Sequence, residues 1–231
     1  MRTVKFVGVA LAIATLAGGS SYRSDCATRA SRFIADSREI TNLTPPTPTT
    51  RRYRLDASQS KFIAHALRGG LFWFKGHDHL VAVREFTGEA QLSPDAIRAS
   101  SLQITAKTDS MVETSSVFTD QQKQIINKEL REIVLLPAQY PEIVFRSTNV
   151  SGKQNGSQYD LKIIGDLTLH GVTRQITIPT KVTETGNDLR AQGEFSINRS
   201  DFKVKATSAF HGLVRVRDKL KFTFDIVGHQ N

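Results

Sequence analysis

The 231-residue chain is poor in cysteine, and its leading apolar segment is short. Cys26 is the only cysteine, so an intrachain disulfide is excluded. The preceding Arg23-Ser24-Asp25 lacks the small and apolar residues expected before a lipid-modified cysteine, so we interpret Cys26 as an incidental thiol. The apolar run Phe6–Ala17 falls short of the ~20 residues that a membrane-spanning helix needs. We therefore expect no stable membrane span.

Signals of nucleic-acid binding and of catalysis are missing as well. The sequence has no RNP-like aromatic motif, no zinc-finger spacing and no nucleophile motif. The net charge of +9 is concentrated in residues 1–54, which hold nine basic and three acidic residues. We interpret this excess as a solvated leader and linker, since charge blocks outside cores are commonly tails. We expect no nucleic-acid partner, no enzymatic activity and no cofactor or resident metal.

The N-terminus has the three parts of an export signal. Arg2 and Lys5 supply a positive region, Phe6–Ala17 an apolar region, and Gly18–Ser21 small residues for cleavage. We predict a signal peptide over residues 1–19 and a periplasmic or secreted protein. An uncleaved anchor is the alternative, because no A-x-A site closes the apolar region.

A linker separates this leader from the folded domain. Residues 20–52 are polar, and their Thr44–Thr50 stretch consists entirely of Thr and Pro. Proline stiffens such a segment and removes backbone donors, so the stretch is unsuited to a sheet. We expect the folded domain over residues 53–231.

Strict alternation of apolar and polar residues between Tyr159 and Val227 predicts consecutive antiparallel strands. Short turns at His170–Thr173 and Thr185–Asp188 join them. Strands joined in this way form a meander, and closing the meander removes its exposed edges. We predict an all-β protein, an antiparallel β-barrel. The alternation is clearest at Leu161, Ile163, Gly165, Leu167 and Leu169.

One segment breaks the strand pattern and predicts a single principal α-helix. Apolar residues recur at helical spacing over Asp120–Leu136, with Asp120 as the N-terminal cap and Pro137 just beyond the end. A lone amphipathic helix in such a barrel suits a lid over one opening. The residues expected to face the barrel are Ile126, Leu130, Ile133 and Val134.

Three motifs, in order along the chain, resemble the YceI-like family. They are Gln139–Thr148, Asp166–Arg174 and Ser196–Phe202, and the resemblance covers about Tyr53 to His229. It implies a lipocalin-like, extended antiparallel barrel that is exported and non-catalytic. It also implies a binding partner enclosed in the barrel, a polyisoprenoid or similar long-chain amphiphile such as a quinone or a fatty amphiphile.

Two segments depart from the usual family pattern. Ile126–Val134 lacks the Asp, His and Phe of the R-D-x-H-L-x-S-x-D-F-F region, so any ligand contacts of those residues are in doubt. Gly76–Leu80 replaces a shorter connection and is similar to a branch with a G-H-x-H loop.

The candidate ligand-binding residues are mostly aromatic. We expect Phe72 and Phe74 to be buried, with Trp73 the more exposed of the three. Small residues on inward faces, Gly165, Ala191 and Gly193, favour a cavity, although glycine also permits bending. The full set of predicted ligand-binding residues is Phe72, Trp73, Phe74, Leu130, Phe145, Leu167, Phe195, Phe222 and Phe224.

The His77-Asp78-His79 loop supports the main alternative, a metal-binding or redox-associated periplasmic protein. On an extended chain both imidazoles point the same way, but zinc normally needs three or four protein ligands. His65 and His170 are possible third ligands. We favour the interpretation that His77 and His79 hydrogen-bond to the loop backbone. We interpret His170 as a turn residue rather than a catalytic base. Two alternatives stay open: that the barrel binds another envelope protein, and that the chain forms a homodimer.

Overall fold

The computed structural model describes residues 49–70, 72–206, 208–209 and 214–231. The predicted signal peptide, Cys26 and most of the predicted linker lie outside these residues. The strands are β1 (Arg51–Gly69), β2 (His79–Val83), β3 (Phe86–Leu92), β4 (Ser101–Lys107), β5 (Met111–Glu113), β6 (Glu142–Asn155), β7 (Gln158–Leu169), β8 (Val172–Thr185), β9 (Asp188–Asn198), β10 (Ser208–Ala209) and β11 (Val214–Gln230). The helical segments that matter below are α1 (Asp120–Glu129), the π-helical turn η4 (Leu130–Leu135) and the 3-10 turns η1 (Trp73–Lys75) and η5 (Arg199–Phe202).

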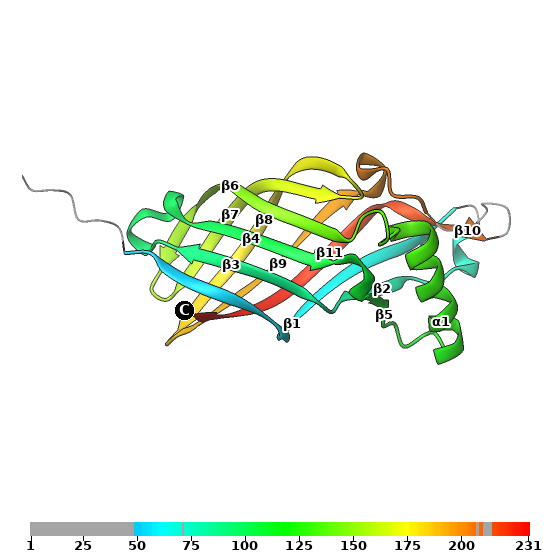
Figure 1. Cartoon of the computed structure of the whole chain (residues 1–231), viewed down its shortest axis with the longest axis horizontal. Helices are drawn as coiled ribbons and strands as arrows, with labels where there is room; N and C mark the ends of the chain where they lie inside the picture. The colour runs from blue at the N-terminus through cyan, green and yellow to red at the C-terminus, as the bar shows by residue number, and fades with distance from the viewer. Residues whose placement is uncertain (1–48, 71, 207, 210–213) are drawn as a thin grey trace, which may run out of the picture. The chain divides into compact units, whose positions relative to one another are not determined.

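Eight of the strands form a closed antiparallel barrel, which confirms the predicted fold class (Figure 1). Their order is β1-β11-β9-β8-β7-β6-β4-β3, and β3 pairs again with β1. The remaining short strands extend the sheet, β2 and β5 beyond β1 and β10 beyond β11. Closure leaves the long strands without open edges, so the inward side chains share one interior.

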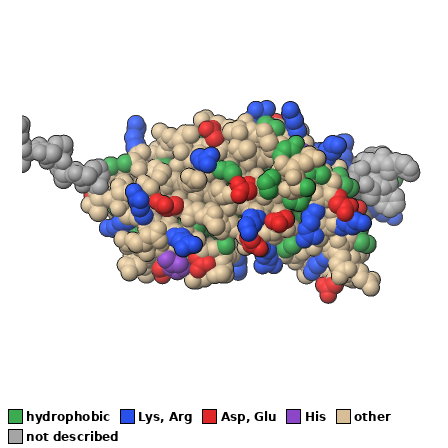
Figure 2. All heavy atoms as spheres, viewed as in Figure 1, with side chains coloured by type: hydrophobic (Ala, Val, Ile, Leu, Met, Phe, Trp, Pro, Cys, Tyr) green, Lys and Arg blue, Asp and Glu red, His purple; other side chains and the backbone are tan. Residues whose placement is uncertain are grey.

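Alternation along each strand separates the interior from the surface, because successive side chains point to opposite faces. In β7, Leu161, Ile163 and Leu167 are buried, whereas Lys162 and Asp166 between them are exposed. Figure 2 shows the resulting surface, with acidic and basic side chains spread over the outer faces of the strands.

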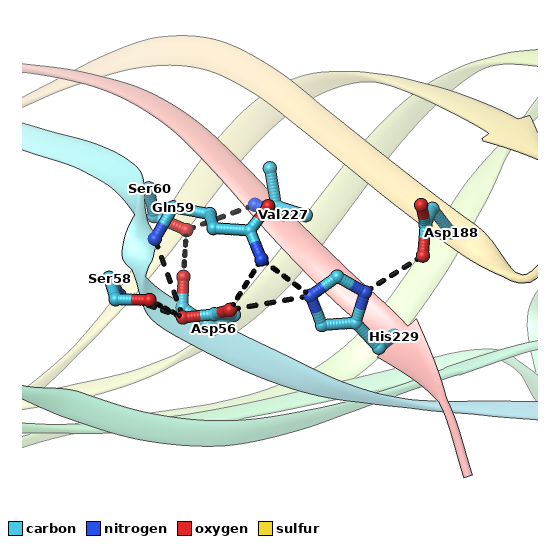
Figure 3. Close-up of polar contacts among 7 residues, drawn as sticks. All are labelled: Asp56, Ser58, Gln59, Ser60, Asp188, Val227 and His229. Carbon is cyan, nitrogen blue, oxygen red and sulfur yellow. Dashed lines mark hydrogen bonds and ion pairs between the residues drawn. The ribbon is translucent and has the colours of Figure 1, made fainter.

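A polar network between β1 and β11 stabilises a shift in the pairing register of β1 (Figure 3). The pairing register shifts between Asp56 and Lys61, and the Asp56 carboxylate accepts hydrogen bonds from the Ser58 amide and hydroxyl at 2.8 and 2.6 Å. His229 lies between two carboxylates, with Nδ1 2.8 Å from Asp188 and Nε2 3.3 Å from Asp56. The histidine therefore links the three strands β1, β11 and β9 on the outside of the barrel.

One α-helix is present among the described residues, and it crosses one end of the barrel, as predicted (Figure 1). Its cap differs from the prediction: Thr119, not Asp120, is the N-cap, and it forms a capping box with Gln122. Within the described ranges, no helix is long and apolar enough to cross a membrane.

The inward face of the helical segment also differs from the prediction at one position. Leu130 is buried, and Ile126 and Val134 are half-buried and line the interior, but Ile133 is 43% exposed. The reason is the π-helical turn, whose wider winding places residues five apart on one face. Leu135 therefore occupies the inward position that α-helical spacing assigned to Ile133.

Candidate functional site

The barrel interior holds two adjoining apolar cavities. The inner cavity measures about 120 Å³, and its polar lining is limited to Gln91, Ser100, Ser101 and Thr180 among the described residues. The outer cavity measures about 420 Å³ and extends to the end covered by α1 and η4, where Ile126, Leu130, Val134 and Leu135 form part of its wall. Both are bounded mainly by inward side chains of the barrel strands.

The two cavities meet at a waist whose five residues line both of them. Aromatic rings narrow this passage, since Phe195 stacks on Phe222 with centroids 4.9 Å apart. The Phe62 ring packs against the same Phe222 ring, with centroids 6.1 Å apart. The waist residues are Phe62, Ala106, Ile143, Leu167 and Phe195.

Six of the nine predicted ligand-binding residues line these cavities. They are Leu130, Phe145, Leu167, Phe195, Phe222 and Phe224. The sequence analysis missed the inward residues of β1, of which Phe62, Ala64 and Ala66 line the outer cavity. The signal available in the sequence was a weak alternation of apolar and polar residues over Lys61–Leu67.

The remaining three predicted residues belong to the turn that follows β1. Phe72 and Phe74 are exposed, at 38% and 60%, so the expectation that they are buried was wrong. They lie in and beside η1 after Gly70, whose φ of 89° turns the chain out of the strand, and their rings meet edge-on at 5.9 Å. The Trp73 side chain lies outside the described part of the chain, and ligand binding by these three residues stays a prediction.

The inward glycines accommodate aromatic rings rather than open space, which corrects their interpretation as cavity-forming. A Cβ atom on Gly193 would lie 2.7 Å from the Phe224 ring, and one on Gly165 would lie 2.5 Å from the Phe145 ring. Each glycine lets a ring from the neighbouring strand pack directly on the backbone. The cavities therefore depend on how these rings pack, not on missing side chains alone.

A buried polar cluster closes the end of the barrel beyond the inner cavity, and the sequence analysis did not find it. The Glu184 carboxylate is only 8% exposed and accepts hydrogen bonds from the hydroxyls of Tyr53 and, at 2.6 Å, Tyr159. Arg51 donates a third bond at 2.9 Å. Tyr53 and Tyr159 are fully buried, and the cluster joins β1, β7 and β8 across the interior. We call these four residues the tyrosine–glutamate cluster.

The electrostatics of this cluster follow from burial and from those hydrogen bonds. Burial alone would raise the pKa of Glu184, but donation by Tyr159, Tyr53 and Arg51 outweighs it and keeps the pKa below the ordinary value. Burial, supported by the bond to Glu184, raises the pKa of Tyr53 to about 12 and raises that of Tyr159 as well. The cluster is therefore an ionised carboxylate held by neutral phenols.

His77 and His79 contact side chains, which corrects the expectation that they bond to loop backbone. His79 Nδ1 lies 2.8 Å from Glu113, whose side chain is fully buried, and the His79 ring stacks on Phe118 at 5.1 Å. His77 meets the same phenyl ring edge-on at 5.6 Å. Burial would raise the pKa of Glu113, but hydrogen bonds from His79 and from backbone amides keep it low. The loop thus fixes the segment before α1 against β2.

The possible third metal ligands do not join this loop. His65 bonds to Thr223 at 2.9 Å and alternates with the inward Ala64 and Ala66, so it faces away from the cavity. His170 occupies the β7–β8 turn with φ 52° and packs on Tyr140 at 4.0 Å. Among the described residues, no three or more potential metal ligands gather. The metal-binding alternative therefore lacks a ligand set in this part of the chain.

Comparison with known proteins identifies the relatives of this barrel. Residues 53–228 match the family described as YceI-like domain. A UPF0312 protein of Yersinia pestis is 40% identical over 83 residues, and Protein YceI of Escherichia coli is 38% identical over 106 residues. These matches cover 36% and 43% of this chain, and only 40% and 52% of the two relatives.

Solved structures of the same fold resemble the barrel over most of their length. Burkholderia cenocepacia BcnA superposes with a TM-score of 0.59 at 22% identity, covering 75% of this chain and 98% of its own. A polyisoprenoid binding domain from Saccharophagus degradans, implicated in plant cell wall breakdown, gives 0.56 at 14% identity, covering 78% and 98%. At these identities the similarity establishes the fold.

Proposed function

Because this chain belongs to the YceI-like family, we propose that it is a non-enzymatic binding protein that encloses a polyisoprenoid or similar long-chain amphiphile. The observation that carries the proposal is the pair of apolar cavities joined at a waist inside a closed barrel. The outer cavity alone, at about 420 Å³, lies within the range typical of ligand pockets, ~300–1,000 Å³. The polyisoprenoid binding domain of similar fold supports the choice of ligand class.

The barrel geometry suits a chain-like ligand that enters from one end. The tyrosine–glutamate cluster blocks the inner end, so the tail would enter past α1 and reach the inner cavity through the waist. Each methylene removed from water contributes roughly 0.8 kcal/mol. A long tail therefore gains affinity from apolar contact alone, and few polar contacts are needed along the tunnel.

A substitution at the waist tests the proposal. Ala106 is 4% exposed and lines both cavities, so the side chain of Ala106→Leu would obstruct the passage. Ala82→Leu is the matched control, because Ala82 is also 4% exposed but lines neither cavity. We expect Ala106→Leu to lower binding of a delipidated sample to a polyprenol at least tenfold, with binding retained in Ala82→Leu.

Stability separates a ligand cavity from a filled core in the same experiment. Overpacking a dense interior costs roughly 1–3 kcal/mol, which we expect for Ala82→Leu. Ala106→Leu should cost less, since the added carbons enter empty space. Native mass spectrometry of gently purified wild type should also show a retained lipid. Wild type that binds no long-chain lipid, with Ala106→Leu as destabilised as the control, would refute the proposal.

We also propose that the protein is exported to the periplasm or secreted, with cleavage near Gly19. The positive, apolar and small-residue regions of residues 1–21 support this proposal. N-terminal sequencing of the protein from its host should find a chain that begins after the apolar region. An intact Met1 in the cytoplasmic fraction would contradict export.

A further inference from the structure

The rim of the outer cavity is rich in positive charge. Among the described residues that line this cavity, Glu129 is the one carboxylate. The histidines His77 and His79 lie on the same lining. Figure 2 shows Lys and Arg side chains over the end of the barrel that carries α1 and β10. The cationic residues of the lining are Arg68, Lys75, Arg199, Lys205 and Arg215.

Acidic neighbours compensate only part of this charge. Arg68 lies 3.9 Å from Asp78, and Arg199 lies 3.8 Å from Asp218. Asp218 is also fixed by the Ser200 hydroxyl at 2.7 Å, a bond that lowers the pKa of this carboxyl and keeps it ionised. In the described ranges, no ion pair within 4.0 Å involves Lys75, Lys205 or Arg215. The rim therefore retains an excess of positive charge.

A polar pocket of about 420 Å³ adjoins this rim and concentrates the charge. It shares Arg199, Arg215 and Val216 with the outer cavity and adds Arg217 and Asp218 from β11. The three arginines exceed the one carboxylate, which lies 3.8 Å from Arg199. The Nε atom of Arg217 donates to the Arg68 carbonyl at 3.0 Å, which orients the guanidinium. We call Arg199, Arg215 and Arg217 the arginine triad.

The pocket is shaped by Gly69 at the end of β1 and by Gly70 directly after it. A Cβ atom on Gly69 would lie 2.9 Å from Cγ of Arg217, so only glycine lets the arginine stem pack there. Gly70 has φ 89°, a conformation that other residues rarely adopt, and it turns the chain away at the edge of the pocket. The arginine triad thus faces a concave space beside the apolar cavity rather than a flat surface.

We propose that the ligand is an anionic amphiphile whose phosphate or carboxylate head is bound by the arginine triad while its tail fills the cavities. The inference rests on the proposed function and adds the chemistry of the head group. Guanidinium groups bind phosphate and carboxylate oxygens through paired N–H donors. Lys75 and Lys205 on the same rim strengthen the field that attracts an anion.

Three probes with delipidated protein test the inference: farnesyl phosphate, farnesol and inorganic phosphate. Farnesyl phosphate and farnesol share one tail and differ only in the head. We expect farnesyl phosphate to bind at least about tenfold more tightly, because charge-assisted bonds are the strong ones. This preference should shrink as salt rises, since rim charges are screened. Inorganic phosphate should bind far more weakly than farnesyl phosphate, because it has no tail to bury.

The variant Arg215→Gln/Arg217→Gln should weaken farnesyl phosphate binding far more than farnesol binding, so that the two ligands bind about equally. Farnesol binding then reports that the barrel is folded. The matched control is Arg174→Gln/Lys181→Gln on β8, where both residues are exposed and line neither cavity nor the polar pocket. This control should retain the full preference. If the double variant does not fold, Arg215→Gln alone should still lower the preference.

The remaining outcomes distinguish the inference from the proposed function. Equal affinity of wild type for farnesyl phosphate and farnesol would overturn the proposal of an anionic head group and leave the proposal of lipid binding intact. Inorganic phosphate that binds as tightly as farnesyl phosphate would indicate a site for free phosphate and overturn the amphiphile. Failure of wild type to bind either farnesyl compound would overturn both.

Discussion

The tyrosine–glutamate cluster should stabilise the barrel strongly, and Glu184→Gln tests this contribution with little change in shape. Gln retains one oxygen that accepts hydrogen bonds but removes the charge. Tyr53 donates to one carboxylate oxygen and Tyr159 to the other, so one of these bonds becomes neutral and the other meets an amide NH2 that cannot accept it. Both bonds lie where the tyrosines are buried, at 0% and 2% exposure. Arg51 is 42% exposed, so water replaces most of its interaction.

The size of the effect follows from these contacts. A hydrogen bond to a charged group contributes ~1.5–3 kcal/mol and a neutral one ~0.5–1.5 kcal/mol. Two affected bonds therefore give a loss of about 2 kcal/mol in the free energy of unfolding. For a domain of ~150–250 residues, 1 kcal/mol shifts the melting temperature by ~2–4 °C. We expect Glu184→Gln to melt about 4–8 °C below wild type at pH 7.

Urea unfolding followed by circular dichroism at several pH values is the decisive assay. The pKa of Glu184 is lower in the folded protein than its unfolded value of 4.5, so the carboxylate stabilises the fold above pH 4.5. That contribution is lost as the pH falls through the folded pKa. The gap between wild type and Glu184→Gln should thus be full near pH 7 and shrink below pH 4.5.

The control for this experiment is Glu194→Gln on β9. Glu194 is 64% exposed and pairs with Lys221 on the surface at 2.7 Å, so its loss should change stability by less than about 0.5 kcal/mol. A Glu184→Gln protein as stable as wild type, or a gap that widens in acid, would refute the reasoning about the buried carboxylate.

Three further substitutions test other parts of the fold. Gly193→Ala should lower the free energy of unfolding by about 1–3 kcal/mol, because its Cβ would lie 2.3 Å from the Pro179 carbonyl, whereas Gly228→Ala, with nearest contacts of 3.3 Å, should cost less. The pKa of His229 is raised in the folded protein, so this histidine stabilises the fold fully below pH 6.5 and loses that contribution as the pH rises through the folded pKa. His229→Ala should therefore be less stable than wild type in acid, and the unfolding curves of the two proteins should converge at alkaline pH. Thr119→Ala should cost about 0.5–2 kcal/mol locally and speed hydrogen exchange in α1, and unchanged exchange would contradict the capping box.

The strands could be predicted from the sequence because their signal is local. Period-2 alternation in β7, β8 and β9 follows directly from which side of the sheet each residue faces, and the short turns contain Gly171 and Gly186 at positive φ. Inward residues such as Phe145 and Leu167 were therefore identified correctly. Closure of the barrel was predicted because it removes the exposed edges of the meander, and the family resemblance implied a barrel as well. It depends on the distant pairing of β1 with β11.

Features that depend on departures from regular geometry could not be predicted. Ile133 was assigned by α-helical spacing, but the chain winds as a π-helix over Leu130–Leu135. Phe72 and Phe74 were expected inside because alternation along a strand would place both on the same face, but they follow Gly70 out of the strand. In each case one local deviation reverses the direction of a side chain.

The tyrosine–glutamate cluster shows a different limit, because its signal was present but ambiguous. Glu184 continues the inward phase of Ile178 and Val182 in β8, and Tyr159 begins the inward phase of Leu161 in β7. A charged residue at the end of a strand more often marks the surface than the interior. Only the arrangement in space, with Tyr53 reaching the same carboxylate from β1, shows that the phase continues inward.

The two ends of the barrel differ in charge, so one orientation of a bound amphiphile is favoured. At the inner end, charge is compensated, because the Glu184 carboxylate is surrounded by donors from Tyr53, Tyr159 and Arg51. At the outer end, cationic side chains exceed their acidic neighbours around an opening that leads into apolar space. An amphiphile would therefore gain from burying its tail toward the tyrosine–glutamate cluster and keeping an anionic head at the rim, whereas the reverse orientation would place a charge in an apolar cavity without a partner.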